Sequence, residues 1–167
     1  TSLVGVLTIR ERLALPGQLA TFEVTGGDAT PTVCVAIDWC HGTYIRFEVE
    51  AFMGRLQELA GTDDAVIIAL AELLCFVCLA AVQGREWDGI LKLYISDNDN
   101  VVRWLNKRSA GNRLARVLLR ILGLLELRHQ FTSVSTFVRT CHNEASDVGT
   151  RTSARETTLF YATLGLK

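Results

Sequence analysis

Three segments near the start of the chain are predicted as strands, the first because its polar and apolar residues alternate with a two-residue period. Such a period places every second side chain on the same side of an extended backbone, so it predicts β-strands. The segments are Leu19–Thr25, Val33–Trp39 and Thr43–Val49. His41 and Gly42 suit a tight turn between the last two, which we therefore expect to form an antiparallel hairpin.

The next segment is too long and too uniformly apolar for a strand. Residues from Asp64 to about Val82 predict a buried helix, with Thr62, Asp63 or Asp64 as its N-cap. The run approaches the length that crosses a membrane, but Glu72 lies in its middle and no basic flank follows. We therefore expect a core helix rather than a membrane span.

Strands and helices alternate through the rest of the chain. Leu91–Ser96 and Phe131–Val138 are predicted as strands, and Asn98–Asn106 and Arg113–Leu127 as helices. A terminal helix is expected in the tail after Asn143. In the second of the two helices the apolar residues recur at three- and four-residue steps and form one broad stripe. They are Leu114, Val117, Leu118, Ile121, Leu124 and Leu125.

This order of elements predicts one α/β domain over residues 19–167. We expect a mixed five-stranded sheet, in which three antiparallel hairpin strands are followed by two parallel strands, flanked by helices. A chain of 167 residues with 49% hydrophobic residues is long enough and apolar enough to bury a core. Residues 1–18 are interpreted as the end of a preceding connection segment.

The cysteines are odd in number and lie mostly in apolar surroundings, so we interpret them as reduced core thiols. Two of them form a CxxC, but it falls inside the helical run and lacks the second pair of a zinc site. No signal peptide is evident, and an intracellular protein is expected. The cysteines are Cys34, Cys40, Cys75, Cys78 and Cys141.

The net charge of −1 conceals a basic C-terminal part. That composition is typical of a phosphate-binding face, although a solvated helix surface explains the arginines on the helix equally well. The basic residues beyond Val101 include Arg103, Lys107, Arg108, Arg113, Arg116, Arg120, Arg128, Arg139, Arg151 and Arg155.

Four acidic residues stand where a metal site can form. Asp28, in the stretch VTGGDATPT, ends the first strand, and Asp97 ends the fourth. If these strands are parallel neighbours, the two carboxylates lie side by side at the edge where α/β sheets bind ligands. Glu72 is on the inner face of the long helix, where a lone charge is costly, and Asp147 begins the last helical segment.

Four short blocks, in order, resemble the ribonuclease H domain of reverse transcriptases, especially those of hepadnaviral polymerases and related retroelements. Each block falls at the expected element, and the resemblance extends over roughly residues 19–151. The last block departs from the usual Asn-x-x-Ala-Asp-x-Leu-Ser-Arg form at Ser146, Gly149 and Thr150, changes expected to alter packing rather than metal ligation. The blocks are GDATPT (Gly27–Thr32), AELL (Ala71–Leu74), SDNDNVVRWL (Ser96–Leu105) and HNEASDVGTR (His142–Arg151).

The resemblance implies a metal-dependent endonuclease that hydrolyses the RNA strand of RNA–DNA hybrids as part of a reverse transcriptase. It implies two Mg²⁺ ions, with Mn²⁺ as a substitute, because hard oxygen ligands suit these ions. The expected partners are the hybrid and a covalently linked polymerase domain, with no membrane. The implied catalytic and metal-binding residues are Asp28, Glu72, Asp97 and Asp147. The candidates to grip phosphates are Arg103, Lys107, Arg108, Arg113, Arg116 and Arg120.

Several of these assignments have alternatives. Asp38 competes with Asp28 as the first carboxylate, although its flanks resemble a strand interior. Asp99 competes with Asp97, because either Asp-Asn pair fits the motif. Asp97 can instead cap the helix that follows, a position that Asn98 can also fill.

His142 and Asn98 are accessory candidates, the former because some ribonuclease H enzymes carry a histidine before the last acid. Two other classes of protein stay open: an inactive ribonuclease H-like binding module, and another nuclease or strand-transfer enzyme on the same fold, such as a resolvase or transposase core.

Overall fold

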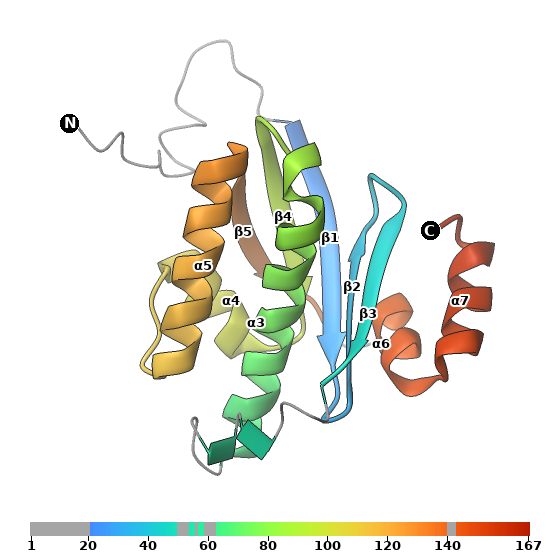
Figure 1. The fold of residues 1–167 in the computed structure, drawn as a ribbon, viewed down its shortest axis with the longest axis horizontal. Coiled ribbons are helices and arrows are strands. Elements are labelled where there is room, and N and C mark those ends of the chain that lie inside the picture. The colour runs from blue at the N-terminus through green and yellow to red at the C-terminus, as the bar shows by residue number, and fades with distance from the viewer. Residues whose placement is uncertain (1–20, 50–53, 56, 59–62, 140–142) are drawn as a thin grey trace.

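The protein is described by a computed structural model that covers residues 21–49, 54–55, 57–58, 63–139 and 143–167. The described chain forms a five-stranded sheet with helices on both faces (Figure 1). The strands are β1 (Thr21–Ala29), β2 (Val33–Asp38), β3 (Thr43–Glu48), β4 (Ile90–Ser96) and β5 (Thr132–Phe137). The helices are α3 (Asp64–Gln83), α4 (Asp99–Lys107), α5 (Arg113–His129), α6 (Glu144–Arg151) and α7 (Ala154–Thr163), with a 3₁₀ turn, η1 (Gly84–Glu86), after α3.

The sheet is mixed, with the strand order β3-β2-β1-β4-β5. β1, β2 and β3 pair antiparallel, whereas β4 pairs parallel with both β1 and β5. The α/β class and the sequence of antiparallel and parallel strands are therefore confirmed. In the register of the central pair, Gly26 lies opposite Ile95, so β1 and β4 end at the same edge of the sheet.

β1 is longer than predicted, and it includes Asp28 instead of ending before the glycines. Glycine is a poor strand former, so the alternation of side chains was lost at Gly26 and Gly27. The packing explains the second glycine, because a Cβ there would lie 2.3 Å from Tyr94 Oη and 2.9 Å from the carbonyl oxygen of Val35.

Every residue of β2 is buried, because the strand lies between two cores. Cys34 and Ala36 face the larger core, which contains α3, α4 and α5. Val35 and Ile37 face a smaller core closed by Tyr161 of α7. The two helical layers are visible on the two sides of the sheet in Figure 1, with α6 and α7 beside β2 and β3.

The central helix α3 packs on the sheet with most of its residues buried. Its N-cap is Asp63, whose carboxylate accepts a hydrogen bond from the backbone N–H of Ala65. Together with η1 it is long and apolar enough to cross a membrane by length and composition alone. Its burial against β1 and β2 is what a core helix requires.

The tail forms two helices where one was predicted. Ser153 separates them and caps α7, since its hydroxyl accepts from the N–H of Glu156 while the Glu156 carboxylate accepts from the N–H of Ser153. This reciprocal capping box starts a new helix direction. It folds α7 back over β2 and β3.

The broad apolar stripe predicted for α5 does not all face the core. Of its residues, Leu118 is buried, but Val117, Ile121 and Leu124 are 41%, 40% and 67% exposed, whereas Leu122, outside the predicted stripe, is buried. The helix is apolar around most of its circumference, so spacing alone did not identify the buried face.

The cysteine prediction was partly wrong, because Cys40 is exposed, whereas Cys34 and Cys75 are buried thiols. Cys40 follows β2 in the turn, where the strand has left the core. The predicted connection segment at residues 1–18, Cys141 and His142 lie outside the described residues.

Candidate metal centre

Three carboxylates from distant parts of the chain meet at the carboxyl edge of β1 and β4. Asp28 is on β1, Glu72 is in the middle of α3, and Asp97 directly follows β4. Each offers an oxygen, and the three oxygens lie within 4.8 Å of one another. Parallel pairing of β1 and β4 produces this meeting, because continuing the register beyond Gly26 and Ile95 places Asp28 opposite Asp97.

Glu72 is the most buried of the three, with 3% of its surface exposed. Burial, and then the charge of Asp97, raises the pKa of Glu72 to about 8. Two neutral donors oppose the rise: Ser96 Oγ donates to Glu72 Oε2 at 2.8 Å, and Asn98 Nδ2 donates to Oε1 at 3.3 Å. The two hydrogen bonds thus hold the carboxyl group in one orientation, but they do not stabilise its charged form enough to offset burial.

Asp28 is half-buried, and burial is the main cause that raises its pKa, followed by the charges of Asp97 and Asp147. The hydroxyl of Thr150 on α6 opposes this rise by donating to Asp28 Oδ2 at 2.7 Å. On the other side of the backbone, the thiol of Cys75 donates to the carbonyl oxygen of Asp28 at 3.4 Å.

The structure separates the two Asp-Asn pairs. Asp97 belongs to the group, whereas Asp99 is the exposed first residue of α4. Asn98 is the N-cap of α4, since its side-chain oxygen accepts from the N–H of Asn100. Capping therefore falls to Asn98, which also bonds Glu72.

Asp147 lies on α6 near this group but outside the 4.8 Å set found among the described residues. Arg151, one helical turn further along α6, binds this carboxylate on the surface, with its Nε 2.6 Å from Oδ1. Its negative charge contributes to the raised pKa of Asp28, so the two carboxylates repel each other. The described site is a close trio with a fourth acid beside it.

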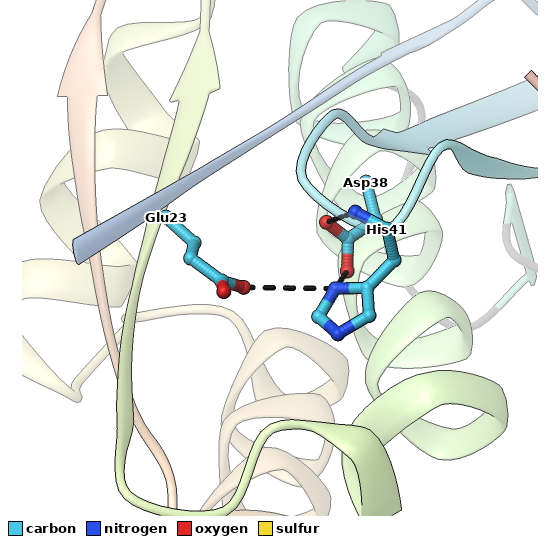
Figure 2. Close-up of side chains that lie close together, drawn as sticks. All are labelled: Glu23, Asp38 and His41. Carbon is cyan, nitrogen blue, oxygen red and sulfur yellow. Dashed lines mark hydrogen bonds and ion pairs between the residues drawn. The ribbon is translucent and has the colours of Figure 1, made fainter. Parts of the chain in front are cut away.

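A second group of potential ligands lies near the opposite end of β1 (Figure 2). His41 Nδ1 is 3.0 Å from Asp38 Oδ2 and 3.6 Å from Glu23 Oε2. Figure 2 shows the imidazole ring turned with this nitrogen towards both carboxylates. The buried ammonium of Lys92 contacts both carboxylates and lies 2.9 Å from Asp38 Oδ2. Trp87 Nε1 donates to the same oxygen at 2.8 Å.

These two groups differ in what balances their charge. At the second, Lys92 already fills the position of a cation between the acids, and its Nζ also lies 4.5 Å from the centroid of the Trp87 ring. Both groups are close enough to hold a metal ion, but a metal at the second would displace a buried ammonium. Asp38, the alternative first carboxylate, belongs to this compensated group.

The predicted basic residues fall into two sets. Arg108 contacts the buried Glu126 and donates to the carbonyl oxygen of Ser133 at 2.8 Å, so its guanidinium holds α5 and β5 together. Arg103 and Lys107 line a shallow pocket with Trp104 between α4 and the loop that follows. Arg113, Arg116 and Arg120 are exposed on α5.

Sequence analysis missed the polar residues that orient the carboxylates. Ser96 and Thr150 donate to Glu72 and Asp28, and both are buried. Asn143 Nδ2 donates to the carbonyl oxygen of Gly27 at 3.0 Å and fixes the start of α6 on β1. The sequence did offer a signal for them, because Ser96 directly precedes Asp97, and Asn143 and Thr150 lie in the same block as Asp147.

No protein-family model matches the chain, and a search of curated proteins finds no match. Function is therefore inferred from the residues and their geometry.

Proposed function

We propose that the protein is a metal-dependent endonuclease of the ribonuclease H type, which hydrolyses the RNA strand of an RNA–DNA hybrid. One observation carries the proposal: Asp28, Glu72 and Asp97 converge, and they stand in three of the four blocks that resemble reverse-transcriptase ribonuclease H domains. The sheet order and the flanking helices agree with that fold.

The donor set fits hard divalent cations. Carboxylate oxygens are the ligands that Mg²⁺ and Mn²⁺ prefer. The raised pKa values of Asp28 and Glu72 arise from burial and neighbouring acids, and the groups that oppose them are neutral. A cation bound here would relieve that repulsion, which Lys92 already does at the second group.

Asp28, Glu72 and Asp97 would hold the ions, and Asp147 would join them after leaving Arg151. Two such ions, when bound, would supply an activated water and stabilise the leaving 3′ oxygen of the RNA. The protein's own residues orient the oxygens for this: Ser96 and Asn98 hold Glu72, and Thr150 holds Asp28.

Substrate grip is assigned to the basic surface of α4 and α5. Arg103 and Lys107 flank the exposed pocket beside Trp104, where phosphates meet two cations and an aromatic ring. Arg113, Arg116 and Arg120 extend the charge along α5. We omit Arg108, because its guanidinium is bound to Glu126. A linked polymerase domain remains part of the proposal.

The test is cleavage of matched RNA–DNA hybrid, duplex DNA and duplex RNA with Mg²⁺ or Mn²⁺. The proposal predicts cleavage of the RNA strand of the hybrid and no cleavage in chelator. An intact hybrid with either ion would refute it. Cleavage of duplex DNA instead would favour a resolvase- or transposase-like enzyme.

A pair of neighbouring variants sharpens this test. Asp97→Asn should abolish cleavage, because it removes a member of the trio. Asp99→Asn should leave cleavage nearly intact, because Asp99 is exposed at the start of α4. Equal effects of the two substitutions would contradict the assigned site.

A further inference from the structure

Thr150 makes the one contact in the described site that joins the last helices to the first carboxylate. Its hydroxyl lies 2.7 Å from Asp28 Oδ2, across 122 residues of sequence. The same oxygen lies 3.0 Å from the carbonyl oxygen of Asp147. A threonine hydroxyl has one hydrogen, and the Asp28 carboxylate is both the nearer acceptor and the charged one, so the hydroxyl donates to Asp28 in preference to the neutral carbonyl of Asp147.

The surroundings hold Thr150 in place. Asn143 ties the start of α6 to β1, as described above, and Arg46 of β3 binds its end. Arg46 Nε donates to the carbonyl oxygen of Gly149 at 3.3 Å, and Nη2 to that of Thr152 at 3.2 Å. Thr150 itself is 5% exposed. The hydroxyl therefore approaches Asp28 from a helix fixed at both ends.

Gly149 permits this close approach. A Cβ at this position would lie 2.1 Å from Tyr161 Oη and 3.1 Å from a methyl of Val35. Tyr161 in turn donates to the carbonyl oxygen of Ala145 at 2.8 Å. A larger residue would push α6 away from the sheet, and Thr150 would move with it. Gly149 and Thr150, two of the three departures from the usual last block, thus act together.

We infer that Thr150 is a positioning residue for the metal site: its hydroxyl fixes the rotation of the Asp28 carboxylate so that its oxygens are presented to a divalent cation together with Glu72 and Asp97. This inference rests on the proposed function. Holding one oxygen of a carboxylate fixes the other, so the ligand is arranged before the ion arrives. Partners of this kind commonly change metal affinity about 10- to 100-fold when they are removed.

The experiment is a titration of the full chain with Mn²⁺, in which electron paramagnetic resonance measures the concentration of the free ion. Thr150→Val removes the hydroxyl at nearly constant shape and should raise the Mn²⁺ dissociation constant about tenfold or more. Thr150→Ser restores the donor and should stay within about threefold of the wild type. Circular dichroism checks folding, and Thr150→Ala takes the place of the valine variant if that variant does not fold.

Thr157→Val is the matched control. Thr157 is fully buried on α7, and its hydroxyl bonds backbone carbonyls of Ser153 and Gly149 rather than a carboxylate. It should lower stability without changing Mn²⁺ affinity. Unchanged affinity in Thr150→Val, or equal losses in Thr150→Val and Thr157→Val, would overturn the positioning role. A wild-type chain that binds no Mn²⁺ would instead refute the proposed metal site itself.

Discussion

Replacing Glu72 by glutamine should stabilise the metal-free protein while it removes a ligand from the proposed metal site. In the folded protein the pKa of Glu72 is about 8, against an ordinary value of 4.5. The folded state therefore keeps a proton that the unfolded chain releases. By linkage, the contribution of Glu72 to the stability of the metal-free protein is fully present below about pH 4.5 and is lost as the pH rises towards 8.

The size of this loss follows from the same values. At pH 7 the titration of Glu72 lowers the free energy of unfolding by on the order of 3 kcal/mol, compared with its value below pH 4.5. Glutamine does not titrate, and its carbonyl can still accept from Ser96. Its amide group cannot accept from Asn98, and that lost hydrogen bond costs about 1 kcal/mol. We therefore expect Glu72→Gln to stabilise the protein by about 1–3 kcal/mol at pH 7. At pH 4.5 the gain falls below the cost of the lost hydrogen bond, and the variant should be no more stable than the wild type.

The assay is urea unfolding of both proteins between pH 4.5 and 8, first in chelator and then with Mn²⁺. In chelator, the difference between the variant and the wild type should grow with pH. With Mn²⁺ it should shrink or reverse, because only the wild type binds the ion well. Calorimetry at pH 7 should also detect a proton released on binding by the wild type, since Glu72 must ionise to become a ligand.

Parallel pH curves for the two proteins in chelator would refute this reasoning. Glu126→Gln provides the control, since Glu126 is equally buried but its charge is met by Arg108 and by the N–H of Ser133. Removing that charge should destabilise the protein at neutral pH, opposite in sign to the effect at Glu72.

Two further predictions concern the cations. Lys92→Met leaves Asp38 and a neighbouring acid without their buried cation, and urea unfolding should show a loss of about 3–5 kcal/mol; a loss below about 1 kcal/mol would mean that the group does not depend on Lys92. Replacing Arg103 and Lys107 together by glutamine should weaken hybrid binding. The slope of the logarithm of the binding constant against the logarithm of the salt concentration should become shallower by the amount that about two phosphate contacts contribute. Arg85→Gln, at an exposed site on η1, should change neither quantity, and an equal effect there would remove the pocket on α4 from the substrate grip.

Local patterns were sufficient to predict most of the fold. β2, β3 and α3 were predicted nearly at their true bounds, because a short turn separates the two strands and α3 is one long apolar run. β1 was cut short at Gly26, where packing against β4 overrides the weak strand propensity of glycine. The capping box at Ser153, which divides the tail, is a local signal that was overlooked.

The candidate site could be predicted only as far as its acids. Asp28, Glu72 and Asp97 stand in recognisable blocks, and their convergence followed from the parallel pairing of β1 and β4. The supporting contact of Thr150 depends on where α6 lies, and that is set by Tyr161 on the next helix and by Arg46, which is far away in sequence. No local period carries this information.

The contact between α6 and β1 has a consequence for the order in which the protein becomes competent. The first carboxylate leaves the ribosome more than a hundred residues before the hydroxyl that orients it, since 122 positions separate Thr150 from Asp28. Closing so long a loop is slow and follows the assembly of nearer contacts. A nascent chain can therefore build most of its sheet and bring Asp28, Glu72 and Asp97 together before α6 is available to orient the first of these carboxylates, and the proposed metal site becomes ordered only when α6 docks on β1.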